Sequence, residues 1–283
     1  MALKDILVHL DAEAGSGASE RRQTFAISLA MAHGAHLTAL IFALEPTIPP
    51  MIMGEVPGSL LESQRERAIE SAQAAAKKFT DAANAAGIQS AVRIVNCTEA
   101  AAGPTLAVHG RTADMVIVGQ EEPDDTLAIR ELLIESALFE SGRATLVVPY
   151  IGGPEDAKLE HIMVGWDGRR EASRAANEAL SLLAEAKDVE VVIVGDDAPS
   201  AHGGEPGADL ALHLARHGLD VNVKRIGSAG IDIANALLSH AADAETDLMV
   251  MGGYGHSRFR EFIFGGTTNS ILSSMTVPVL MAH

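Results

Sequence analysis

The chain has 283 residues, 47% hydrophobic and 21% charged, which is the composition of a folded globular protein. Its formal net charge of −17 argues against a nucleic acid or an anionic membrane surface as a partner, because both would repel it. No apolar run approaches the ~20 residues of a membrane span, the first residues do not resemble a signal peptide, and Cys97 is the single cysteine. We therefore expect a cytoplasmic protein without disulfides that binds a small molecule.

The two halves of the chain repeat each other. Both begin with a stretch that runs through a charged residue and four mostly apolar positions to an aspartate. The matching stretches, in chain order, are Leu3–Ser19 with Leu159–Ser173, Thr112–Gln120 with Thr246–Tyr254, and Ala144–Tyr150 with Pro278–His283. Repetition of this kind indicates a duplicated domain. We expect one domain over residues 1–150, a linker at Gly152–Asp156, and a second domain over residues 157–283.

Short apolar runs alternate with amphipathic segments in each half. In the second half, helical spacing predicts helices over Arg170–Ala186 and Gly207–Gly218. The runs that predict strands are His161–Trp166, Val189–Val194, Val221–Ile226, Asp247–Gly252 and Val277–Ala282. Strands that alternate with helices indicate a parallel sheet covered on both faces. Each half is therefore predicted to be an α/β domain with five parallel strands, doubly wound and Rossmann-like. We expect the edge strands Ala144–Tyr150 and Val277–His283 to pair the two halves as a pseudo-dimer within the chain; a homodimer of the whole chain stays open.

A glycine-rich loop, MGGYGHSRFREFIFGGTT, follows the predicted fourth strand of the second half. Ligands of doubly wound sheets bind beyond the carboxyl ends of the strands. Backbone N–H groups at the start of a helix attract phosphate, and Thr267 or Thr268 offers a hydroxyl or an N-cap. The alternative is a tight turn that the glycines allow and the threonines cap. No Walker A loop or G-x-G-x-x-G motif is present.

These residues resemble the universal stress proteins, in their tandem form. That family has an aspartate at the end of its first strand and a G-x2-G-x9-G-[S/T] loop after its fourth, within an adenine-nucleotide α-hydrolase-like fold. The second half matches at Asp167, Gly252, Gly255 and Gly265. It departs at Gly266, where the family has Ser or Thr, and the hydroxyl follows one residue later.

The resemblance implies a stress-response protein that binds ATP or AMP, with magnesium held through the phosphates if at all. Asp167 would contact the adenine or ribose, with turn formation beside Gly168 as its alternative role, and Val194 would rest against the adenine or only pack in the core. His256, inside the loop, could touch a phosphate. The residues expected around the phosphates are Gly252, Gly255, Gly265, Gly266, Thr267 and Thr268.

The corresponding stretch of the first half, Val116–Phe139, keeps only Gly119 of the motif. Four carboxylates stand where phosphates would lie, at Glu121, Glu122, Asp124 and Asp125. Each contact between like charges ~4–6 Å apart costs a few kcal/mol, so these carboxylates would repel a phosphate. Asp11 still ends the first strand, but we expect this half to be degenerate and to bind no nucleoside triphosphate.

An inserted segment over residues 46–59 is rich in proline and precedes a predicted helix, Leu60–Ala86. Two hypotheses stay open for the insertion: it is a loop, or it is a lid or a partner surface.

The sequence predicts no catalytic group and no dedicated metal site. His213 and His217 have helical metal-ligand spacing, but no third ligand follows at a recognisable interval. We expect a nucleotide-binding protein with slow ATP hydrolysis at most. The alternatives are a tandem stress protein that binds no nucleotide and acts as an interaction or dimerisation platform, and a nucleotide hydrolase that uses Asp167 or His256.

Overall fold

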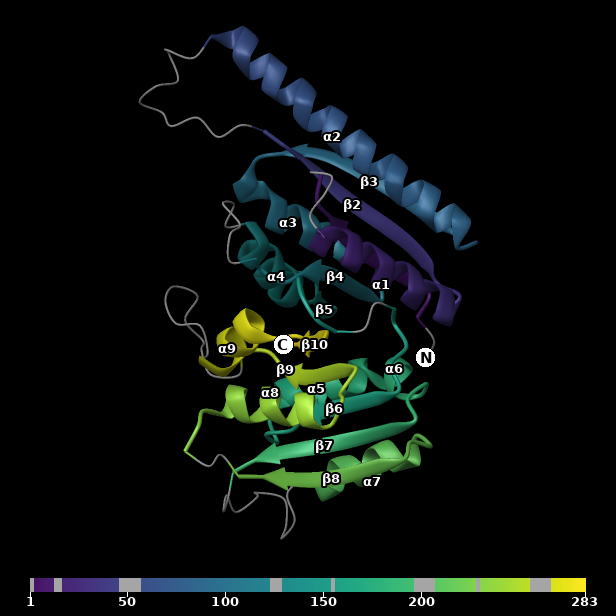
Figure 1. Cartoon of the computed structure of the whole chain (residues 1–283), viewed down its shortest axis with the longest axis vertical. Coiled ribbons are helices and arrows are strands. Elements are labelled where there is room, and N and C mark those ends of the chain that lie inside the picture. Colours follow the sequence, from purple (N-terminus) through teal and green to yellow (C-terminus); the bar gives the residue numbers. More distant parts are fainter. Residues whose placement is uncertain are drawn as a thin grey trace. The chain divides into compact units, whose positions relative to one another are not determined.

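The computed structural model describes residues 3–12, 17–45, 57–122, 129–153, 156–195, 207–227, 230–254 and 266–283. The described chain forms two compact units (Figure 1). The first unit is chiefly Leu3–Arg143, and the second is chiefly Ala144–Pro154 with Lys158–His283.

The first unit contains four parallel strands in the order β3-β2-β1-β4. Their bounds are β1 Asp5–Leu10, β2 His36–Leu44, β3 Ser90–Cys97 and β4 Met115–Gly119. The helices between and after them are α1 Gly17–His33, α2 Gly58–Ala85, α3 Glu99–Gly110 and α4 Ile129–Glu140. Strand β4 is buried along its whole length, as expected where helices cover both faces of a parallel sheet.

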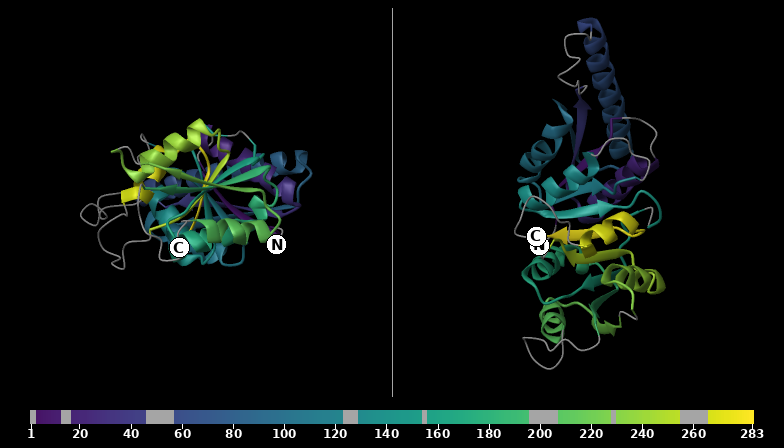
Figure 2. Two further views of the ribbon diagram at one scale, coloured as in Figure 1. Left: turned by 90° about the horizontal axis from the view of Figure 1, so that it is seen from below. Right: turned by 90° about the vertical axis from the view of Figure 1, so that its left-hand side faces the viewer.

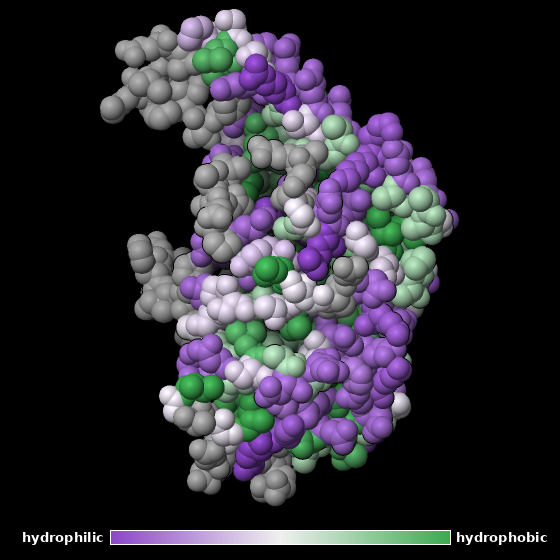
Figure 3. Space-filling model, viewed as in Figure 1, coloured by the Kyte–Doolittle hydropathy of each residue, from purple (hydrophilic) through white to green (hydrophobic). Residues whose placement is uncertain are grey.

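Helix α2 matches the predicted helix Leu60–Ala86 to within two residues at its start. It buries one narrow stripe of small side chains and Phe79. Its outer side is mostly hydrophilic (Figure 3), so the helix is an amphipathic cover for β2 and β3. Residues 46–56 of the insertion lie outside the described residues, and the loop and lid hypotheses for it stay open.

The second unit has five parallel strands with one antiparallel strand at an edge, in the order β5-β10-β9-β6-β7-β8. The strands are β5 Ala144–Val148, β6 His161–Gly165, β7 Asp188–Val194, β8 Val221–Ile226, β9 Leu248–Gly252 and β10 Val279–Ala282. The helices are α5 Arg170–Glu178, α6 Leu180–Leu183, α7 Ala208–Arg216, α8 Ile233–Asp243 and α9 Gly266–Ser274. Helices α7 and α8 lie on opposite faces of this sheet (Figure 2), which confirms the doubly wound α/β fold.

Two details differ from the sequence prediction. The segment Arg170–Ala186 is interrupted at Ala179 and forms α5 and α6 instead of one helix. Strand β5 belongs to the first repeat but groups with the second unit, because it pairs antiparallel with β10, with Leu146 opposite Leu280. The predicted pairing of the two edge strands is therefore confirmed.

Candidate functional site

The candidate site lies at the carboxyl ends of β9, β6 and β7, which are neighbours in the second unit. The chain runs from β6 to β7 and β8 on one side, and β9 and β10 lie on the other side. Strand β6 is therefore at the point where the strand order reverses, which is where doubly wound sheets bind their ligands.

Gly252 ends β9 against the first turn of α5. A Cβ on this residue would stand 2.5 Å from the backbone nitrogen of Ala172 and 2.8 Å from the carbonyl carbon of Glu171. No side chain fits there, so the glycine is required by the close approach of strand and helix. The structure thus gives Gly252 a packing role that is independent of any phosphate.

Asp167 lies in the turn between β6 and α5, with 54% of its side chain exposed. Its Oδ1 accepts a hydrogen bond of 3.0 Å from the backbone N–H of Arg169, across Gly168, whose φ is +74°. This is the turn that the Asp-Gly pair predicts. Its Oδ2 lies 3.9 Å from Nε of Arg169 at the exposed surface, where it can still accept hydrogen bonds.

Val194 ends β7, opposite Ile226 of β8, and is half-buried. Gly195 follows it with φ of +132° and donates to the carbonyl of Ile226. The partly exposed valine thus offers an apolar surface at the strand end, beside the switch point.

The start of α9 is tied to the end of β9 by one hydrogen bond. Tyr254, with φ of +53°, donates its backbone N–H to Oγ1 of Thr268 at 3.1 Å. Thr268 is 4% exposed, so its hydroxyl is engaged in the fold. Because α9 begins at Gly266, Thr267 and Thr268 lie in its first turn, and the expectation that one of them caps the helix is wrong. Among the described residues, nothing lies within 4 Å of a Cβ built on Gly266.

Three of the predicted loop residues, Gly255, His256 and Gly265, lie outside the described residues. The structure brings Gly252 close to the first turn of α5, and it brings Thr268 to the loop start at Tyr254. Asp167 follows β6, which pairs with β9, and Val194 ends β7, which pairs with β6. All the described candidates of the second unit therefore lie at the carboxyl ends of the parallel strands of one sheet.

Sequence reasoning missed Glu171, a buried carboxylate beside the site. It is 4% exposed in the first turn of α5 and pairs with the Arg170 guanidinium. Burial raises the pKa of Glu171, but hydrogen bonds from Arg170 and from its own backbone N–H outweigh burial and hold this pKa below its usual range. The helix N-terminus favours the same charge, so Glu171 stabilises the start of α5.

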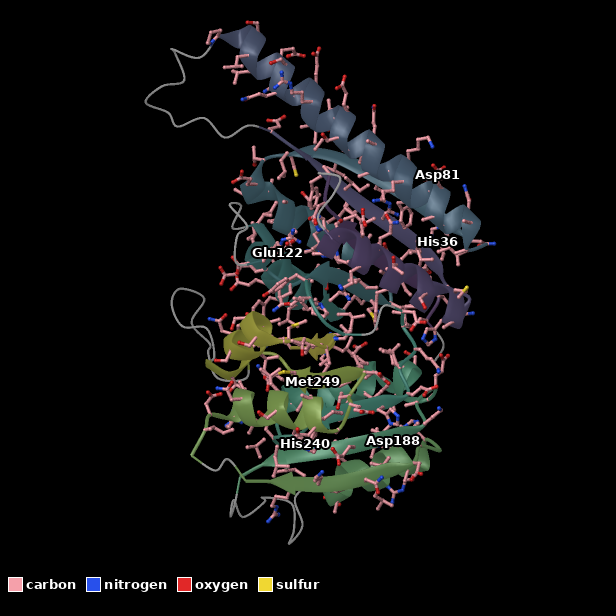
Figure 4. All side chains as sticks on the ribbon, viewed as in Figure 1. His36, Asp81, Glu122, Asp188, His240 and Met249 are labelled. Carbon is pink, nitrogen blue, oxygen red and sulfur yellow. The ribbon has the colours of Figure 1, made fainter. Side chains whose placement is uncertain are left out.

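The first unit holds a cluster of charged side chains at the equivalent place. Gly119 ends β4, and a Cβ there would overlap Nη1 of Arg22 and stand 3.1 Å from Nη1 of Arg130. Arg22, from α1, donates to Oδ2 of Asp11 at 2.7 Å. Arg130, in the first turn of α4, lies 3.3 Å from the same oxygen and 3.0 Å from Oε1 of Glu122. Figure 4 shows Glu122 near α4.

These arginines were not found from the sequence, which gave weight only to the acidic residues that follow β4. Glu122 is paired with Arg130, a partner that the sequence did not reveal. The expected repulsion of phosphate from this half stays a prediction. Asp124 and Asp125 lie outside the described residues. A lone arginine in an amphipathic helix carries no sequence signal that distinguishes it from a solvated charge.

Burial and charge set the ionisation of the cluster. Burial lowers the pKa of His9 to about 3, with Arg22 and Arg130 acting in the same direction and Asp11 opposing them. Burial would raise the pKa of Asp11, but the charges of Arg22, His9 and Arg130 and the hydrogen bond from Arg22 together outweigh burial and keep this pKa well below its usual range. At neutral pH the cluster therefore contains a neutral His9 and an ionised Asp11.

Among the described residues, no group of three or more His, Cys, Asp or Glu side chains could hold a metal ion. The rings of His213 and His217 contact each other edge to face at 4.9 Å, and His213 lies 3.3 Å from Oδ1 of Asn177. Burial raises the pKa of the Cys97 thiol, with Glu45 adding to the effect, which disfavours the reactive thiolate.

The chain is similar to known proteins in its sequence. Residues 158–283 match the model of the universal stress protein family. Universal stress protein Slr1230 of Synechocystis sp. is 33% identical over 102 residues, which are 35% of this chain and 33% of that protein. The chain thus matches about a third of the length of this curated relative. Both matches agree with the family that the sequence resembles, and the family model matches the second half of the chain.

Solved structures share the fold of nearly the whole chain. A universal stress protein from Archaeoglobus fulgidus has a TM-score of 0.71 at 16% identity, over 98% of this chain and 95% of that one. A putative universal stress protein from Pseudomonas aeruginosa has a TM-score of 0.51 at 16% identity, over 99% and 92% of the two chains. In the part of the chain that the structure describes, no helix is both long and apolar enough to cross a membrane.

Proposed function

We propose that the second unit binds an adenine nucleotide, ATP or AMP, and that the protein acts in the stress response as a binding module. Asp167 would contact the adenine or ribose and Val194 the ring. The residues expected around the phosphates are Gly252, Gly255, His256, Gly265, Gly266, Thr267 and Thr268. Any magnesium would be held by the phosphates.

The observation that carries this proposal is the exposed carboxylate of Asp167 at the switch point of the second sheet. Among the described residues, it pairs with the backbone N–H and the guanidinium of Arg169, so a nucleotide can bind the carboxylate without breaking a buried ion pair. At the same end of the sheet, no atom of the described residues lies within 4 Å of a Cβ built on the first residue of α9, as a helix start that receives phosphate requires. Thr268 supports the cradle indirectly, because its hydroxyl fixes the loop start at Tyr254.

The single tryptophan of the chain gives a direct measurement. Trp166 is half-buried and adjacent to Asp167. We expect ATP or AMP to change its fluorescence with saturation, and Asp167→Asn to weaken binding about tenfold, the cost of one good hydrogen bond to a charged group. Asp220→Asn, an exposed aspartate before β8, serves as the matched control and should bind like the parent chain.

A fluorescence titration that is flat up to millimolar nucleotide, with no nucleotide released on denaturing the purified protein, would overturn the proposal. That result would favour the alternative, a tandem stress protein that binds no nucleotide and serves as an interaction or dimerisation platform. The antiparallel pair β5–β10, which joins a strand of the first repeat to the second sheet, is the observation that supports this alternative.

The proposal includes no catalytic residue and at most slow ATP hydrolysis. Of the described acids near the site, Glu171 pairs with Arg170, and Asp167 is assigned to binding the adenine or ribose. A general base would have to lie within hydrogen-bond reach of an attacking water. We propose the cytoplasm as its location, in agreement with the single cysteine.

A further inference from the structure

The charged cluster of the first unit contains a buried guanidinium group with unused donors. Arg22 is 1% exposed and donates from Nη2 to Asp11. Its Nε and Nη1 are buried and make no hydrogen bond. A buried polar group without a partner costs about 1–3 kcal/mol, and more when it is charged. Buried polar groups in native folds nearly always have a hydrogen-bond partner, so we expect a water or an ion to bind these nitrogens.

The arrangement around Arg22 is specific for a negative group. Nη1 of Arg22 and Nη1 of Arg130 both approach the place that a side chain on Gly119 would fill. The glycine thus allows two guanidinium groups to converge from α1 and α4. Planar guanidinium groups bind the oxygens of carboxylates and phosphates, through short and strong hydrogen bonds.

The charges leave the buried part of the cluster positive. Arg22 and Arg130 carry two positive charges, and their common partner Asp11 carries one negative charge. His9 is neutral at pH 7, since its pKa lies near 3. The second negative charge comes from Glu122 at the rim, whose side chain is 29% exposed. The side chain of Asp11 is 20% exposed, so the cluster is open to solvent on the side of its acids.

We propose that the first unit binds a small oxyanion, inorganic phosphate or a group of the same chemistry, between Arg22 and Arg130. The anion accepts hydrogen bonds from the unused nitrogens of Arg22 and takes the place on Arg130 that the carboxylate of Glu122 occupies. The carboxylate of Glu122 and an external anion therefore compete for Arg130. This site is independent of the nucleotide proposed for the second unit.

Glu122 gives a test that does not disturb the buried arginines. Glu122→Gln keeps the shape of the side chain and removes the competing charge, and it should raise the affinity for inorganic phosphate about tenfold. Glu66→Gln, on the exposed surface of α2, makes the same change of net charge away from the cluster. Binding is measured by titration calorimetry on the full chain at constant ionic strength, with sulfate as a second probe. Arg130→Gln should abolish the binding.

The readouts separate this site from the other unit. Phosphate bound at Arg22 should leave the fluorescence of Trp166 unchanged, whereas a nucleotide at Asp167 should change it. The expected result is saturable phosphate binding that Glu122→Gln strengthens and Glu66→Gln does not. The proposal is overturned if neither the parent chain nor Glu122→Gln binds phosphate, if both glutamate variants behave alike, or if a crystal grown with phosphate shows only water on Arg22.

Discussion

Strands β4 and β9 both end in a glycine, but the two glycines pack against different groups. Gly119 and Gly252 hold equivalent positions in the two repeats, and neither can carry a Cβ. Gly252 is confined by the backbone of α5, and Gly119 by the guanidinium groups of Arg22 and Arg130. A glycine of the motif therefore persists in both units for packing reasons, and Gly252 alone does not separate a nucleotide-binding unit from a degenerate one.

The largest difference between the units should appear at their first-strand aspartates. Asp11→Asn removes the carboxylate that pairs with Arg22, whose side chain is 1% exposed, at 2.7 Å. Removing one partner of a buried ion pair costs about 3–5 kcal/mol, and we expect the lower end because Asp11 is partly exposed. Asp167→Asn, at an exposed turn, should change stability by less than ~0.5 kcal/mol. Urea unfolding of the two variants measures both effects, and equal losses would contradict the contrast.

The two glycines should respond differently to a methyl group. Gly252→Ala places a Cβ 2.5 Å from the Ala172 nitrogen, which belongs to a helix and cannot rotate away. Overpacking of this kind costs about 1–3 kcal/mol, and a clash with backbone belongs at the top of that range. Gly58→Ala is the control, because no atom of the described part of the chain lies within 4 Å of its Cβ position.

Gly119→Ala should destabilise the protein mainly through Arg22, since the severe clash is with the far end of that side chain, whereas Nη1 of Arg130 would stand 3.1 Å away. Combining it with Arg22→Met should therefore cost about as much as Arg22→Met by itself, measured as a double-mutant cycle. Strictly additive losses of unfolding free energy would show that Gly119 is confined by something other than Arg22.

A smaller effect is expected in the pH dependence of the free energy of unfolding, and it comes from His9 in the first unit. His9 has a folded-state pKa of about 3, below the ~6.5 of an unfolded chain. The unfolded state therefore binds more protons as the pH falls below ~6.5, and stability decreases by up to ~1.4 kcal/mol per pH unit. Between pH 7.5 and 5, His9→Gln should remove about 2 kcal/mol of this loss. His217→Gln, on the exposed surface, should leave the pH dependence as it is; a similar change in both variants would contradict the assignment to His9.

Periodicity was enough to predict the doubly wound fold, because strands such as Leu248–Gly252 are short, apolar and separated by helical spacing. The strand-end positions of Asp167 and Val194 followed from the same pattern. The arginine cluster could not be predicted, because Arg22 of α1 and Arg130 of α4, more than 100 residues apart in the chain, meet on the carboxylate of Asp11. Spacing within one loop also could not show that Gly252 is held by α5, since that approach is a tertiary contact.

The smallest expected effect tests the tie between β9 and α9. Thr268→Val keeps the shape of the side chain and removes the oxygen that accepts the N–H of Tyr254. A buried donor then lacks its partner, which costs about 1 kcal/mol and up to ~3 kcal/mol. Thr268→Ser keeps the hydroxyl and should lose less. If the hydrogen bond fixes the loop start for a nucleotide, Thr268→Val should also weaken nucleotide binding measured by Trp166 fluorescence, and Thr268→Ser should restore it. A loss of stability with unchanged binding would limit Thr268 to the fold of the second unit.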